Sequence, residues 1–146
     1  MWYILMYQLV HHNMGEAHMK SLDVTFLLVL GLLIWILGTV YYANRGPSIL
    51  ETTRSRYWTE FVFAPICSAI LCIAILRWRH IAPGQWTSAM LMLAIPGMIG
   101  EAVVLCNLAT FMPKLRAASG GRYGGLLFAT YALVLGVAEI VTLGIR

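Results

Sequence analysis

Four apolar stretches, each about 20 residues long, constrain the fold of this chain more than any other feature, because a helix of that length crosses a hydrocarbon core of roughly 30 Å. The stretches run from about 22 to 42, 57 to 76, 86 to 112 and 123 to 145. Hydrophobic residues make up 60% of the 146 residues, charged residues make up 11%, and the mean hydropathy is +0.79. That balance is far from the composition of a soluble domain. The sequence therefore predicts a polytopic membrane protein.

The connections between the stretches, 44–56, 77–85 and 113–122, are too short to hold a domain. Lipid cannot satisfy backbone polar groups, so helical spans joined by short links must pack against one another. We therefore expect an all-α integral membrane protein, a four-transmembrane-helix bundle forming a single domain over 20–146.

The leader, residues 1–19, reads MWYILMYQLVHHNMGEAHM. Its apolar part has no basic region before it and no small-residue cleavage site after it, so a signal peptide is not expected. Two alternatives remain: translation that starts at Met19, or a short interfacial helix. The imidazoles of His11, His12 and His18 are of a type that binds metals, but no metal-binding motif accompanies them.

The basic residues gather at the ends of the spans, where they anchor helices to lipid headgroups. This placement, and not nucleic-acid binding, accounts for the net charge of +4. The loops after the first and third spans carry Arg45, Arg54, Arg56, Lys114, Arg116 and Arg122, and the opposite side carries Lys20, Arg77, Arg79 and Arg146. Because positive loops stay in the cytoplasm, we expect a multi-pass inner-membrane protein with both termini outside.

No catalytic constellation can be assembled from these residues. Cys67, Cys72 and Cys106 form no CxxC pair and have no histidine near them in sequence, so they are expected to be small packing residues. The spans contain no pair of histidines that could ligate a haem, and no Ser-His-Asp set is present. We expect no enzyme activity, no cofactor and no metal.

The third span contains an acid in the apolar run AIPGMIGEAVVLCN (94–107). Glu101 has no basic residue in its own span, and a charge placed in lipid costs at least a few kcal/mol, so the side chain must face the protein. Pro96 is expected to kink the helix and free backbone carbonyl groups, which line substrate sites in transporters. Gly97 and Gly100 allow a neighbouring helix to approach closely.

Two further acids lie in the spans, Glu60 in the second and Glu139 in the fourth. Their expected depths, with that of Glu101, form a staircase with steps of about 8 to 10 Å. Such spacing suits a proton relay through water or a cation path, because buried carboxyl groups can exchange protons near neutral pH.

Plain structural alternatives exist for these polar residues. Glu60 has Arg56 one turn behind it, which favours an ordinary ion pair. Glu139 could lean towards Arg146 or meet Arg77 or Arg79. Two further pairings involve hydrogen bonds: Asn107 is expected to bond to a neighbouring helix, and Tyr131 and Thr130 are the expected partners of Glu101.

The segments IPGMIGEAVVLCNLATFMP (95–113) and GRYGGLLFATYALVLG (121–136), with the end of the first span before Arg45-Gly46-Pro47, carry a family resemblance. The chain resembles a bacterial family of small four-span membrane proteins known only as domain of unknown function 5367. The resemblance covers most of the chain after Met19. It implies the four-span fold, and it brings no reaction, substrate or cofactor.

Two classes of function fit these observations. One is a noncatalytic membrane component in which Glu101 is a buried hydrogen-bonding group. The other is a small proton- or cation-coupled transporter or channel that uses Glu101, together with Glu139. Besides the lipid bilayer, partners are limited to a second copy of the chain or another membrane protein, for which Gly121 and Gly125 supply a GxxxG spacing.

Overall fold

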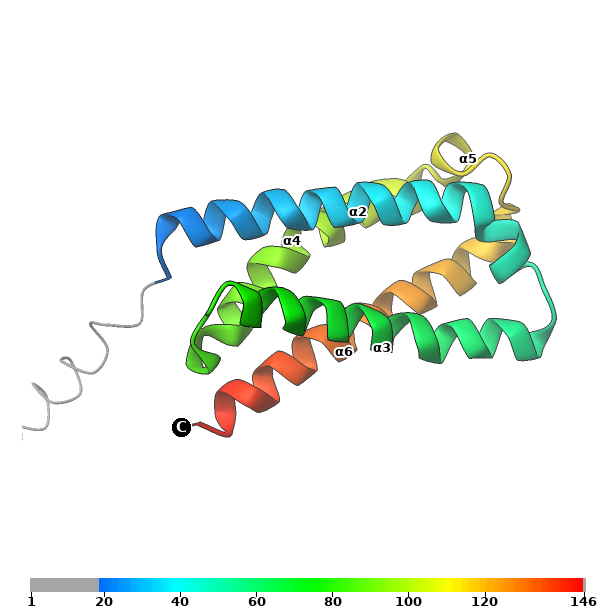
Figure 1. Ribbon diagram of the computed structural model, residues 1–146. Coiled ribbons are helices and arrows are strands. Elements are labelled where there is room, and N and C mark those ends of the chain that lie inside the picture. Colours follow the sequence, from blue (N-terminus) through cyan, green and yellow to red (C-terminus); the bar gives the residue numbers. More distant parts are fainter. Residues whose placement is uncertain (1–18, 146) are drawn as a thin grey trace, which may run out of the picture.

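The computed structural model describes residues 19–145 and consists of helices joined by short links (Figure 1). Four of the helices are long and apolar enough to cross a membrane: α2 (Ser21–Leu50), α3 (Arg54–Trp78), α4 (Trp86–Cys106) and α6 (Gly120–Leu143). The shorter ones are η1 (Pro83–Gln85), α5 (Leu108–Phe111) and η2 (Ala117–Ser119). The described range contains no strand. The predicted all-α, four-span architecture is therefore confirmed.

The long helices do not pack in the order in which the chain runs. The most extensive contacts join α2 to α4, α3 to α6, and α4 to α6, whereas the consecutive helices α2 and α3 touch only slightly. In Figure 1, α2 lies along α4, and the end of α6 lies at the same end of the bundle as the start of α2. Consecutive helices run up and down in alternation, as the short links require.

Two helix ends differ from the expected bounds. The first span was expected to end near Tyr42, but α2 continues through Pro47 to Leu50. Ile49 and Leu50 are buried in a cluster that also contains Leu115, so tertiary packing outweighs the local cost of a proline in the last turns. The third span was expected to reach residue 112, but α4 ends at Cys106.

Two clusters of buried side chains hold the bundle together. One, near the start of α2, contains Leu27, Ala89 and Met90, and the other, near its end, contains Leu50 and Tyr123. Apolar side chains also cover the outside of the bundle, as expected where helices contact lipid instead of water. Helices gain little from hydrophobic burial in such surroundings, so close packing and hydrogen bonds hold them together.

Helix α2 approaches the backbone of α4 closely at Gly31. A Cβ atom added to Gly31 would lie 2.0 Å from the backbone oxygen of Leu93, so only glycine fits there. By contrast, a Cβ added to Gly121 would meet nothing within 4 Å, and one added to Gly125 would meet the Tyr57 hydroxyl at 3.7 Å. Within the described chain, the predicted GxxxG spacing therefore forms no tight helix contact.

Candidate functional site

Glu101 lies inside the bundle, as its sequence context predicted. Its side chain belongs to α4 and the residue is 7% exposed. The Tyr123 hydroxyl, on α6, donates a hydrogen bond to Oε2 of Glu101 over 2.8 Å. Tyr123 is itself fully buried, and its ring meets the ring of Tyr42 edge-on with centroids 5.4 Å apart.

The expected hydrogen-bond partners of Glu101 were wrong. The Thr130 hydroxyl donates to the Leu126 carbonyl on its own helix over 2.9 Å, and the Tyr131 hydroxyl packs against Gly97. The reason is depth. Because α4 ends at Cys106, Glu101 lies about 10 Å from the middle of the Pro83–Cys106 span and not about 3 Å from it, at 1.5 Å per residue. At that level the neighbouring residue on α6 is Tyr123.

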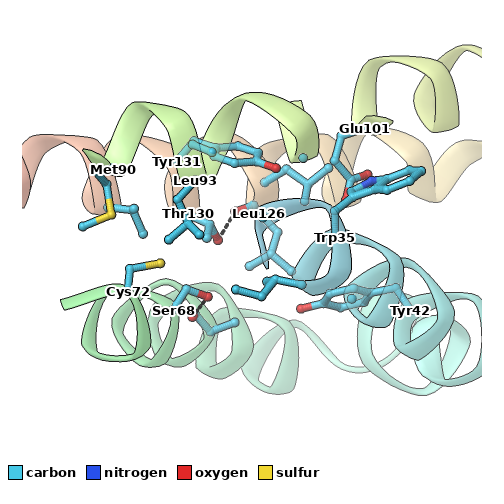
Figure 2. Close-up of a pocket in the computed structure, with 18 residues that line it drawn as sticks. Trp35, Tyr42, Ser68, Cys72, Met90, Leu93, Glu101, Leu126, Thr130 and Tyr131 are labelled. Atoms are coloured by element: carbon cyan, nitrogen blue, oxygen red, sulfur yellow. Dashed lines mark hydrogen bonds between the residues drawn. The ribbon is translucent and has the colours of Figure 1, made fainter. Parts of the chain in front are cut away.

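A cavity of about 170 Å³ lies beside Glu101 and is lined by residues of all four long helices. It lies between the two buried clusters, and its walls are mostly apolar. Figure 2 shows Trp35 and Tyr42 at the same end of the cavity as Glu101, and Cys72 and Met90 at the other end. The side chains labelled there are Trp35, Tyr42, Ser68, Cys72, Met90, Leu93, Glu101, Leu126, Thr130 and Tyr131.

A second cavity, of about 140 Å³, lies between α4 and α6. Two of the residues that line it, Met98 and Phe128, are exposed on the outside of the bundle. Glu101, Leu127 and Tyr131 line both cavities. These three side chains therefore form the wall between the central cavity and a groove on the lipid-facing surface.

Two glycines of α4 allow aromatic side chains to pack directly against the helix backbone near Glu101. A Cβ at Gly97 would lie 2.5 Å from the Tyr131 hydroxyl oxygen, and a Cβ at Gly100 would lie 2.3 Å from the ring of Trp35. The indole Nε1 of Trp35 is buried and has no hydrogen-bond partner among the described residues. Helix α4 remains helical through Pro96.

Glu139 lies apart from this site. Its Oε2 accepts a hydrogen bond from the Thr87 hydroxyl over 2.7 Å, and Thr142 joins the same network at the start of α4. The expected contact with Arg79 is not formed, because the Arg79 guanidinium pairs with Asp23 of α2 and lies 4.7 Å from the centroid of the Phe26 ring. Arg146 lies outside the described residues. Thr87 precedes Glu101 by 14 residues on α4, about 21 Å along the helix, so Glu139 and Glu101 lie in different parts of the bundle.

Glu60 and Asn107 have other surroundings than expected. Glu60, on α3, is partly buried and makes no ion pair with Arg56 among the described residues. It is close enough to Tyr42 for a Coulombic interaction with the tyrosine hydroxyl, and so is Glu101. The Asn107 side chain donates to the Val103 carbonyl of its own helix over 3.1 Å. Asn107 thus marks the end of α4 and does not bridge two helices.

The residues that the sequence did not single out are Tyr123, Trp35 and Tyr42. Tyrosines near the ends of membrane spans commonly lie at the lipid interface, but Tyr42 and Tyr123 both turn inwards. Within residues 19–145, no three His, Cys, Asp or Glu side chains come together to hold a metal ion. The three histidines of the leader lie outside the described part of the chain.

Comparison with protein families gives one match. A model of a family of unknown function (DUF5367) matches residues 49–143. The match includes Glu101, Tyr123 and Tyr131, leaves out most of α2, and covers most of the chain after Met19, so the family resemblance is confirmed. No curated protein and no solved structure matches the chain.

Proposed function

Because the chain belongs to DUF5367, a family of unknown function, we infer its activity from the site and propose that it is a small transport protein that exchanges a proton for a monovalent cation at Glu101. The observation that carries this proposal is the placement of one buried carboxyl group beside a cavity to which all four long helices contribute.

The electrostatics of the cavity support an exchange. An ionised carboxylate costs about 2.5 to 3.5 kcal/mol at the centre of a membrane helix, and the cost is smaller at the depth of Glu101, about 10 Å from the middle of its span. A proton or a bound cation removes that cost. The empty ionised state is therefore disfavoured, and the site is most stable when it holds one of the two. Such a site couples the loss of a proton to the gain of a cation.

The wall between the two cavities supports access from two sides. Glu101, Leu127 and Tyr131 separate the central cavity from the groove between α4 and α6. Because the Tyr131 hydroxyl rests on Gly97, rotation of this side chain away from the glycine would open the wall next to Glu101. A transporter site must be reached from two sides in turn, and here one of the two routes passes through the lipid-facing groove.

We further propose that the protein lies in the inner membrane with its basic end in the cytoplasm. That end carries Arg116 and Arg122, whereas at the opposite end Arg79 is paired with Asp23. A cysteine placed at Ala82 should react with a membrane-impermeant thiol reagent in spheroplasts, and one placed at Ala118 should not. The reverse pattern would contradict this orientation.

One observation favours a second candidate, a noncatalytic membrane component. The hydrogen bond from Tyr123 to Glu101 ties α6 to α4, so the carboxyl group already has a structural role. In this case the protein would supply a stable bundle to another membrane protein, and Glu101 would neither gain nor lose a proton during its work.

Replacing Glu101 by Gln separates the two candidates, because an amide oxygen can still accept the hydrogen bond from Tyr123 but cannot carry the exchanged proton. The matched control is Glu139→Gln, which changes a carboxyl group of similar type outside the cavity. In proteoliposomes with an internal pH indicator, inward gradients of sodium, potassium and choline are applied in turn. We expect cation-driven proton efflux from the wild type and from Glu139→Gln, and none from Glu101→Gln. Well-folded wild-type protein without proton efflux for any of these cations would favour the noncatalytic candidate.

A further inference from the structure

The chemistry of the central cavity restricts which cation it can take. Among the residues of 19–145 that line it, Glu101 is the only one with a charged side chain. The other walls are apolar or aromatic, and the hydroxyl groups of Ser68 and Thr130 donate to carbonyl groups of their own helices over 2.8 and 2.9 Å. A single negative charge in these surroundings matches a single positive charge.

A bare or hydrated inorganic cation fits this lining poorly. Hard metal cations take six or more oxygen ligands. Here one carboxyl group supplies the only strong ligand, and one of its oxygens already accepts a hydrogen bond from Tyr123. A cation whose charge is surrounded by its own carbon atoms needs no such set of oxygen ligands.

Aromatic side chains supply the remaining recognition. Trp35, Tyr42 and Tyr131 line the cavity with Glu101. Aromatic faces attract ammonium groups within about 6 Å of the ring centroid, and the attraction is stronger when the pair is desolvated. The volume of about 170 Å³ sets the size, because an engineered apolar cavity of about 150 Å³ takes up benzene.

We infer that the ligand of the central cavity is a small organic monocation, a substituted ammonium of about the size of benzene, held by Glu101 and the aromatic residues beside it. This inference rests on the proposed exchange at Glu101 and names the class of cation that is exchanged. Larger lipophilic cations exceed this volume, and neutral molecules of the same shape lack the charge.

The pH dependence follows from the groups that face Glu101. These are Tyr42 of α2, and Tyr123 and Tyr131 of α6; on α3, Cys72 lies at the other end of the cavity and Glu60 interacts with Tyr42. None of them is basic. Binding of the cation therefore displaces the proton of Glu101, and affinity should rise by about tenfold per pH unit until the empty site loses its own proton.

The test uses choline, whose charge does not change with pH, and the full chain in lipid nanodiscs. Calorimetry in buffers of different ionisation enthalpy gives both the affinity and the number of protons released. Three comparison ligands are 3,3-dimethylbutan-1-ol, a neutral isostere of choline, tetraphenylphosphonium, which exceeds the cavity, and sodium. We expect choline to bind with release of one proton, and the comparison ligands to bind at least about tenfold more weakly, equivalent to 1.4 kcal/mol.

A cavity-filling variant keeps the test independent of Glu101. Gly38 lines the cavity, and a Cβ added there would meet nothing within 4 Å, so Gly38→Leu should fill the space without strain. Gly136 is an equally open helical glycine outside the cavity and serves as the matched control. We expect Gly38→Leu and Glu101→Gln to lose choline binding by at least about tenfold, with Gly136→Leu within about twofold of the wild type.

Choline binding that survives both Gly38→Leu and Glu101→Gln would overturn the inference, and so would tighter binding of tetraphenylphosphonium or of the neutral isostere. Proton release driven by sodium but not by choline would overturn the inference and leave the proposed exchange standing. Choline binding with proton release in nanodiscs, but without transport in proteoliposomes, would support the inference and overturn the proposed transport function.

Discussion

Replacing Tyr123 by Phe removes the one hydroxyl group that bonds to Glu101 and keeps the buried ring that packs on Tyr42. Hydrogen bonds between membrane helices are worth about 0.6 kcal/mol on average and up to about 1.7 kcal/mol. We expect a value within this range, about 1 kcal/mol, for the bond from Tyr123 to Glu101. If Glu101 ionises in the bundle, its bond to Tyr123 strengthens to about 1.5 to 3 kcal/mol.

A double-mutant cycle measures this bond without the other effects of each substitution. The cycle joins Tyr123→Phe, Glu101→Leu and the double variant, and the free energy of unfolding is measured in bicelles by steric trapping. We expect a coupling energy of about 1 kcal/mol at acidic pH and a larger one at alkaline pH, since a carboxylate accepts more strongly than a carboxyl group. A coupling energy near zero at both values would refute the hydrogen bond and the orientation of Glu101 derived from it.

Two further changes test the packing of α2. Gly31→Ala should destabilise the fold by about 1 to 3 kcal/mol, because the new Cβ would overlap the Leu93 carbonyl oxygen. The control Gly136→Ala should be neutral or stabilising by up to about 1 kcal/mol. Equal unfolding free energies for the two variants would contradict the close helix contact. Asp23→Asn should cost about 1 kcal/mol or less by leaving Arg79 without its ion pair, and the loss should shrink in high salt. A loss that does not change with salt concentration would show that the pair acts through packing instead.

Much of this fold could be predicted from hydropathy alone, because lipid permits few arrangements of an apolar chain. The inward orientation of Glu101 followed from the cost of a charge in lipid. The length of α2 did not, since the Gly46-Pro47 pair has the local character of a helix end. Its continuation to Leu50 depends on contacts with residues that are far from it in the sequence, and the local sequence does not predict those contacts.

The identity of the residue that bonds to Glu101 lay beyond sequence reasoning for a similar reason. It depends on the level at which α4 and α6 cross, and an error of six residues in the end of α4 is enough to move the expected partner from Tyr123 to Tyr131. The inward turn of Tyr42 was also hidden, because tyrosine is common at membrane interfaces and its sequence position fits that role equally well. A pattern along one chain does not reveal the rotation of one helix against another.

The weak contact between α2 and α3 has a consequence for biosynthesis. A ribosome delivers these two helices to the membrane first, and they have little surface with which to hold each other. Helix α2 gains its main neighbour only when α4 arrives, and α3 must wait for α6, the last to be made. The early half of the protein therefore dwells unassembled in the bilayer, where the insertion machinery and membrane proteases encounter it. Substitutions on the face of α6 that meets α3 should consequently lower the amount of protein in the cell more than they lower the stability of the finished bundle.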